Sequence, residues 1–165
     1  MTLTESEFFD ACRKGDLQKV AMLASSHAEL INVEDHKGFT PLIIAVYNDN
    51  EEVVKFLLQQ GARPELHDMS GNTALMGACF KGYKEIAQML ITAGADVNQR
   101  NGNGATALTF AATFGHLEIA EMLMQNGGDI SIPDSRGKTP FDHAVIQENV
   151  PMIELLERYI NQSAP

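Results

Sequence analysis

Apolar residues recur along the chain in short groups at helical spacing, separated by stretches rich in glycine, aspartate and asparagine. One face of a helix would carry four apolar side chains in each of two segments, namely Val53, Val54, Leu57 and Leu58, and Ile119, Ala120, Leu123 and Met124. Gly61 and Gly127 follow these two segments at the same distance and suit the end of a helix. The pattern predicts short amphipathic helices joined by tight turns, and it is typical of an all-α fold.

The pattern has a period of 33 residues. Four threonines are each separated from the next by 33 positions, namely Thr40, Thr73, Thr106 and Thr139. Each has a glycine two positions before it and an aspartate or asparagine five positions before it. A fixed period of this length is characteristic of repeat architectures, in which each unit buries its apolar face only by stacking on its neighbours.

The recurring residues have simple structural roles. Asp or Asn followed by Gly supplies a turn together with the positive φ that the turn needs. The threonine can cap the free N–H groups of the next helix, and Pro41 and Pro140 suit its first position. Gly82 and Gly115 are expected to end the first helix of their units. The sequence therefore predicts a loop, a helix, a turn and a second helix in every period.

The segments Thr40-Pro-Leu-Ile-Ile-Ala45 and Thr73-Ala-Leu-Met-Gly-Ala78 resemble the T-P-L-H-x-A core of the ankyrin repeat. An earlier unit without the threonine begins the chain, because Ala11–Gly15 matches Ala78–Gly82. The resemblance implies an all-α ankyrin-repeat solenoid with five stacked helix-turn-helix units and β-hairpin or loop fingers. We expect one domain over residues 1–165, divided into units one to five at 1–34, 35–67, 68–100, 101–133 and 134–165.

Units one and five depart from the repeat and are interpreted as caps. Unit one has Ser6-Glu7 in place of Thr-Pro, and unit five has Gln147-Glu148-Asn149 at the turn between its helices. We expect polar outer faces on both, as terminal repeats require. Cys12 and Cys79 occupy equivalent positions and are predicted to be buried packing residues. Met22, as an equivalent of Phe56, is likewise assigned to the core.

Composition and charge narrow the possible functions. The net charge of −10 argues against binding to nucleic acid or to anionic lipid. An acidic amino terminus, two cysteines and no apolar run long enough to cross a bilayer predict a cytoplasmic protein. His36 and His67 lie in neighbouring fingers, but no Cys-x-x-Cys or His-Glu-x-x-His accompanies them. We therefore expect no cofactor, no metal and no catalytic site, and an enzyme or a metal-binding protein is the weaker alternative.

Ankyrin repeats differ at a few positions per unit, on the fingers and on the first helices, that line a concave binding face. Carried over by resemblance, these positions are Arg13, Lys14, His36, Lys37, Phe39, Tyr47, Asn48, Met69, Asn72, Phe80, Lys81, Asn103, Thr113, Phe114, Arg136, Lys138 and Ile146. The set holds six of the chain's twelve Lys and Arg residues and none of its 22 acidic ones. It also holds four aromatic residues at positions where the repeat leaves side chains exposed.

Exposed aromatic residues beside basic ones are typical anchors of a protein–protein contact. The sequence predicts an adaptor or inhibitor that binds a partner protein with acidic and apolar groups at the contact. In the alternative structural reading, the rings pack on neighbouring fingers and the charges are simply solvated. A self-associating scaffold that pairs through the same face is the second functional hypothesis. We expect a monomer.

Overall fold

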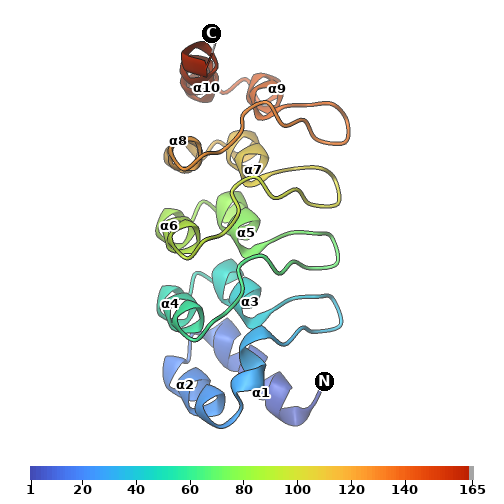
Figure 1. The fold of residues 1–165 in the computed structure, drawn as a ribbon, viewed down its shortest axis with the longest axis vertical. Coiled ribbons are helices and arrows are strands. Elements are labelled where there is room, and N and C mark those ends of the chain that lie inside the picture. The colour runs from blue at the N-terminus through green and yellow to red at the C-terminus, as the bar shows by residue number, and fades with distance from the viewer. Residues whose placement is uncertain (164–165) are drawn as a thin grey trace.

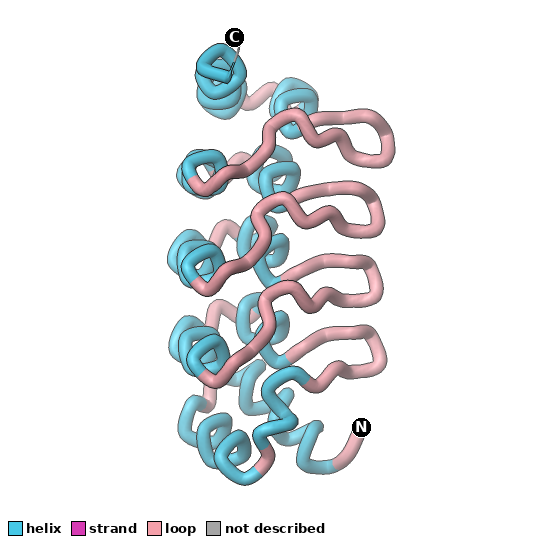
Figure 2. Tube along the Cα trace, in the orientation of Figure 1, coloured by secondary structure: helices cyan, strands magenta, loops and turns pink. Residues whose placement is uncertain are grey.

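A computed structural model describes residues 1–163 of the chain. The last two positions of the predicted unit five, 164–165, lie outside the described residues. Across residues 1–163, ten α-helices are arranged as five pairs that stack along one axis, with a loop projecting to the same side from each of units two to five (Figures 1 and 2). The pairs are α1 (Leu3–Lys14) with α2 (Leu17–Ser26), α3 (Pro41–Tyr47) with α4 (Glu51–Gln59), α5 (Ala74–Lys81) with α6 (Lys84–Thr92), α7 (Ala107–Phe114) with α8 (Leu117–Gln125), and α9 (Pro140–Ile146) with α10 (Val150–Ser163).

The recurring threonines start the first helices as the sequence predicts. Each threonine hydroxyl accepts a hydrogen bond from the backbone N–H three residues on, at 3.3 Å for Thr73 and Met76. Pro41 and Pro140 stand in the first turn of α3 and α9. Gly82 and Gly115 end α5 and α7 in the left-handed conformation, which glycine adopts without steric cost. Local sequence therefore fixes where these helices begin and end.

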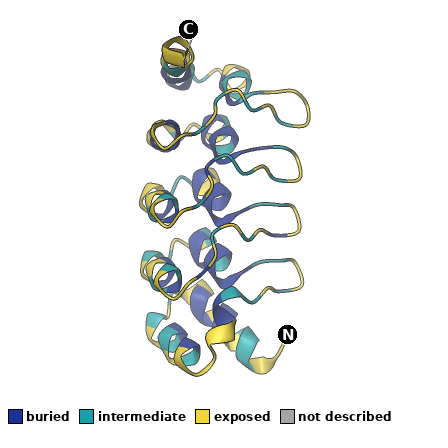
Figure 3. Cartoon of the chain, in the orientation of Figure 1, coloured by how far each residue is buried: buried dark blue, intermediate teal, exposed yellow. Residues whose placement is uncertain are grey.

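Stacking buries the apolar faces between units. The first helices contact one another in one column (α1, α3, α5, α7, α9), and the second helices contact one another in a second column. Leu42, Leu75 and Leu108 are equivalent and are each only 1% exposed between successive first helices. Figure 3 shows the buried residues concentrated in the column of first helices, while much of the second helices is intermediate or exposed. The core is therefore continuous along the stack.

The loops that project from units two to five form a row of fingers. One Oδ1 oxygen of Asp68 accepts hydrogen bonds from the backbone N–H groups of Ser70 and Asn72, at 2.8 and 2.9 Å. Asp35, Asn101 and Asp134 bind their fingers in the same way. Within residues 1–163 the fingers contain no strand, and one isolated bridge pairs His67 with Thr73. The fingers are loops, the second of the two forms predicted.

Backbone hydrogen bonds join each finger to the next. The amide of Met69 donates to the carbonyl of Lys37 at 3.0 Å, and Gly102 donates to Ser70 at 2.9 Å. The approach is close because the turn residue is a glycine. A Cβ atom on Gly71 would lie 2.8 Å from the backbone nitrogen of Gly102. The fingers therefore stack as a ladder beside the helices.

Unit one differs from its predicted form. Helix α1 begins at Leu3, well before Ser6, and Thr2 caps it in a reciprocal arrangement with Glu5. Cys12 and Cys79 are fully buried, as predicted. Assigning Met22 to the core was wrong, because this side chain is 59% exposed on α2. Equivalent methionines in inner units have a helix on each side, whereas Met22 has a neighbouring unit on one side only.

The outer end of unit five is less polar than expected. Gln147 and Glu148 are exposed as predicted, but Val145, Ile146 and Val150 are exposed as well. Val145 is 46% exposed, whereas the residues at its equivalent positions in units two to four are fully buried. The prediction of a polar outer face is therefore wrong for this part of unit five.

Candidate interaction surface

The predicted binding residues lie on the fingers and on the C-terminal ends of the first helices. Together they form what we call the finger–helix surface, defined by the seventeen residues given above. Thirteen of them are exposed, and Phe39, Tyr47, Asn72 and Thr113 are partly buried. The surface runs along the stack, from Arg13 on α1 to Ile146 on α9. Its members at the two ends therefore do not meet in one pocket.

Phe80 and Phe114 form a direct contact in the middle of this surface. Their ring centroids are 4.8 Å apart and their planes are at 87°, an edge-to-face arrangement. Phe80 is the penultimate residue of α5 and Phe114 is the last residue of α7, one repeat position further along its unit, so the two rings meet across the unit boundary. Phe80 remains 39% exposed and Phe114 48% exposed. The two rings give the surface an apolar centre that a partner can cover.

The backbone beneath the aromatic pair is held between units. A ring nitrogen of His116, Nε2, lies 3.1 Å from the carbonyl oxygen of Phe80. His116 also fills the space beside Gly82, where a Cβ atom would lie 2.5 Å from the imidazole ring. The end of α5 is therefore fixed by the following unit, which limits the entropy that Phe80 loses when a partner binds.

Phe39 and Tyr47 are less available than their positions suggest. The two rings meet edge to face, 6.4 Å apart, and both pack against the core. A Cβ atom on Gly77 would lie 3.1 Å from the ring of Tyr47, so Gly77 leaves room for that ring on α5. Partial burial and the nearby carboxylate of Asp68 raise the pKa of the Tyr47 phenol. The expectation that these two rings are exposed anchors is corrected, because each packs on the neighbouring structure.

The basic residues of the finger–helix surface are mostly free of acidic partners. Arg13 pairs with Asp10 on α1. Among the residues that the structure describes, Lys14, Lys37, Lys81, Arg136 and Lys138 form no ion pair within 4.0 Å. The aspartates that bracket the fingers direct an oxygen to backbone N–H groups. The surface therefore carries positive charge that is available to an acidic ligand.

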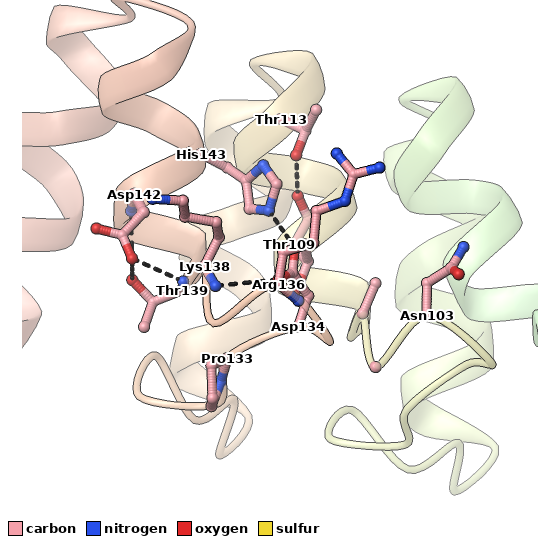
Figure 4. Close-up of polar contacts among 12 residues, drawn as sticks. Asn103, Thr109, Thr113, Pro133, Asp134, Arg136, Lys138, Thr139, Asp142 and His143 are labelled. Atoms are coloured by element: carbon pink, nitrogen blue, oxygen red, sulfur yellow. Dashed lines mark hydrogen bonds and ion pairs between the residues drawn. The ribbon is translucent and has the colours of Figure 1, made fainter.

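The fifth finger contains the best-defined polar cluster of the surface. His143 of α9 places Nε2 2.7 Å from Oδ2 of Asp134, with Arg136 and Lys138 on the same finger (Figure 4). Partial burial raises the pKa of Asp134, but hydrogen bonds from the Lys138 and Arg136 amides and from His143 outweigh it. The net shift of this pKa is downward. A shallow cavity of about 260 Å³ lies between this cluster and Asn103 of the preceding finger. Sequence reasoning had assigned no role to His143.

A second concavity lies on the opposite column of helices. It measures about 390 Å³ between α4 and α6 and is lined by Leu58, Met89, Gln88, Thr92 and Lys55 among others. The apolar residues Leu58 and Met89 fall at regular apolar positions of α4 and α6, so no local pattern separates them from core residues. This groove is the principal rival to the finger–helix surface as a place where a ligand could bind.

Two further observations concern metal and membrane. Across residues 1–163, no group of three or more His, Cys, Asp or Glu side chains is placed to hold a metal ion. No helix in the same range is long and apolar enough to span a bilayer.

The two cysteine thiols are buried in the core. Burial raises the pKa of the Cys12 thiol to about 12 and also raises the pKa of the Cys79 thiol.

Known proteins share the repeat over parts of the chain. The fission yeast Schizosaccharomyces pombe BTB/POZ domain-containing protein 3 is 43% identical over 56 residues, which are 34% of this chain and 11% of that protein. The human mitochondrial disaggregase is 36% identical over 64 residues, 39% of this chain and 9% of that protein. The rat ankyrin repeat and SAM domain-containing protein 6 is 42% identical over 48 residues, 29% of this chain and 5% of that protein. The matched segments therefore span about a tenth or less of these relatives.

Two family models cover most of the chain. The model for ankyrin repeats in three copies matches residues 8–101, and the model for ankyrin repeats in many copies matches residues 90–144. The first alone covers more than half of the sequence, and the helix pairs, the threonine caps and the stacked fingers of the structure agree with both. The chain belongs to the ankyrin-repeat family.

Proposed function

We propose that this chain is an adaptor or inhibitor that binds a partner protein through the finger–helix surface. Ankyrin repeats are protein-interaction modules, and the matched models describe repeats of this kind. The observation that carries the assignment to this surface is the edge-to-face pair of Phe80 and Phe114, exposed in the middle of the stack. Large aromatic side chains with fixed positions contribute disproportionately to binding at protein interfaces.

Charge supports a particular kind of partner. Lys81 follows Phe80 directly and is exposed, and Lys37, Arg136 and Lys138 extend the positive charge along the fingers. We propose that the partner places an apolar side chain against the aromatic pair and acidic groups against the neighbouring fingers. The free thiols of Cys12 and Cys79 fit a reducing compartment, so we assign the function to the cytoplasm.

In the proposed contact, the charges and the aromatic rings affect different rate constants. Attraction between the basic fingers and an acidic partner should mainly raise the association rate and make it sensitive to salt. Covering Phe80 and Phe114 should mainly slow dissociation, because most affinity differences among variants of one interface lie in that rate. The two contributions can therefore be measured separately.

The test uses a partner captured by the wild-type chain and then measured by surface-binding kinetics at two salt concentrations. We expect Phe80→Ala to weaken binding by about 2 kcal/mol, or roughly thirtyfold in Kd, chiefly through faster dissociation. Lys81→Glu should chiefly slow association. Both residues are exposed, so circular dichroism should show an unchanged fold.

Matched controls lie on the second helices. Met22→Ala removes a side chain that is more exposed than Phe80, and Glu52→Ala and Glu121→Ala change charge on the same column. These variants should leave affinity nearly unchanged. Loss of binding in the control variants alone would show that the partner uses the second-helix column, and the assignment to the finger–helix surface would be wrong.

A further inference from the structure

The outer end of unit five exposes side chains at positions that every inner unit buries. Phe141 and Ile153 are partly exposed. Their equivalents in unit four, Leu108 and Ala120, are 1% and 0% exposed. Val145 is likewise exposed, whereas its equivalents in units two to four are fully buried. These residues come from both α9 and α10, so the apolar character extends across the end of the stack.

An open cavity of about 460 Å³ adjoins this end. It is lined by Ile130, Thr139, Phe141 and Ile160, together with two serines. In units two to four the second helix stops and the chain turns at a glycine, as α8 does before Gly127. Helix α10 instead continues through the equivalent position, Ile160, as far as Ser163. The cavity therefore lies where inner units place the loop that leaves their second helix.

Charges of opposite sign border the apolar end. On one side, the fifth finger exposes Arg136 and Lys138. On the other side, Glu157 of α10 is exposed at a position that holds Met124 in unit four. Figure 1 shows the fifth finger and α10 on opposite sides of α9. The end thus combines an apolar centre with one basic and one acidic edge.

We propose that this end face, made by Phe141, Val145 and Ile153 with Arg136 and Glu157 at its edges, binds a second copy of the chain end to end. A twofold axis perpendicular to the stack and parallel to its helices inverts one copy relative to the other. It brings the fifth finger of each copy over α10 of the other. Arg136 then faces Glu157 twice in a closed, self-complementary interface, and the apolar centres cover each other.

We assign the occupant as a second copy because this symmetry sets the basic finger of each copy against the acidic edge of the other. A partner that is uniformly acidic would be repelled at Glu157, and a uniformly basic one at Arg136. The interface uses Arg136 of the finger–helix surface but leaves Phe80 and Phe114 free, so a dimer would present two aromatic pairs and bind partners bivalently. The proposal departs from the monomer expected from the sequence.

Analytical ultracentrifugation of the full chain over rising concentration tests the proposal. Each copy carries a net charge of −10, so the measurement belongs at physiological ionic strength, where charges more than about 8 Å apart are screened. We expect a reversible monomer–dimer equilibrium that Val145→Glu shifts to monomer. Val145 is half exposed, so this variant should keep its circular dichroism spectrum and melting temperature. Met22→Glu, an equally polar change at the other end of the stack, should leave the dimer intact.

Charge exchange gives a test that does not depend on the apolar centre. Arg136→Glu and Glu157→Arg should each weaken the dimer about tenfold, because each change acts on two symmetric contacts. The double variant should restore the wild-type dissociation constant. A chain that stays monomeric at all concentrations, or a dimer that survives Val145→Glu, would overturn the proposal. Loss of the dimer in a Phe80→Ala, Phe114→Ala variant would do the same and would place self-association on the finger–helix surface.

Discussion

Units three and five share the same repeat pattern, but neighbouring units cover unit three on both sides and unit five on one side only. In unit three, Leu75 and Cys79 of α5 are almost completely buried, because α3 and α7 pack on either side. In unit five, the equivalent Phe141 and Val145 of α9 have a neighbour on one side only and are partly exposed. The difference shows that burial in this stack is set by adjacent units more than by the residue type at a position.

The fingers show the same contrast. Gly71 of unit three and Gly137 of unit five both turn at positive φ, 81° and 75°. A Cβ atom on Gly71 would collide with the next finger, whereas one on Gly137 would meet nothing within 4 Å. In unit three this glycine therefore allows the positive φ and also leaves room for the next finger. In unit five it serves only the positive φ.

The largest expected effect comes from removing a core side chain in each unit. Leu75→Ala should lower the free energy of unfolding by about 2–5 kcal/mol, because the cavity it leaves is enclosed by units on both sides. Phe141→Ala should cost less although the removed side chain is larger, since solvent can enter from the open end. Urea denaturation of the two variants measures the difference. Equal or reversed costs would contradict the proposed limits of the units.

A smaller difference is expected between the two turn glycines. Gly137→Ala should cost about 1 kcal/mol, the penalty for placing a side chain in a left-handed conformation. Gly71→Ala should cost about 1 kcal/mol more, because the new methyl group displaces Gly102 and breaks its 2.9 Å hydrogen bond to Ser70. Thermal melts of the two variants provide the comparison. Identical melting temperatures would show that the finger ladder adds no stability.

Acid should affect unit five more than unit three. Hydrogen bonds from the backbone N–H and the hydroxyl of Thr139 lower the pKa of Asp142, at the start of α9. A lowered carboxyl pKa contributes stability that is present above the ordinary value of 3.8 and is lost as pH falls through the lower folded value. The equivalent residue in unit three is Met76, which does not titrate.

Asp142→Asn should therefore reduce the loss of stability on acidification, while lowering stability slightly at neutral pH. Urea midpoints measured from pH 5 down to pH 3 would show a flatter dependence in the variant. An unchanged acid limb would mean that other carboxylates control acid unfolding, of which Asp129 and Asp134 also have lowered pKa values.

The last prediction is that removing metal ions and reducing disulfides has no effect on the stability of the fold. Cys12 and Cys79 are free and buried in different units, and no metal is expected from the sequence. Chelator together with reductant should leave the melting temperature unchanged. The difference in free energy of unfolding between Leu75→Ala and Phe141→Ala should also stay the same. A fall of several degrees with chelator alone would revive the metal-binding alternative.

Much of the fold follows from local sequence. The threonine caps, the turn glycines and the bracketing aspartates act within a few residues, so a 33-residue period predicts them and the stack that they imply. Features that depend on contacts between units could not be predicted in this way. Tyr47 packs over Gly77 of the next unit, and no local pattern distinguishes it from an exposed anchor.

The candidate site shows the same limit. The sequence identified Phe80 and Phe114 separately, but their contact requires a side chain at one repeat position to reach across to the next position in the neighbouring unit. The sequence also did not predict the apolar end of unit five. When unit five is aligned with its neighbours, Val145 occupies a position that is normally in the core. In both cases the missing information is the position of an adjacent unit.

Hydrogen–deuterium exchange of the chain with and without its captured partner tests the central claim most directly. We predict that the partner slows exchange in the fingers of units two to four and at the ends of α5 and α7, around Phe80 and Phe114. Exchange in α4, α6 and α8 should stay the same. Protection confined to those second helices, with the fingers unchanged, would contradict the assignment of binding to the finger–helix surface.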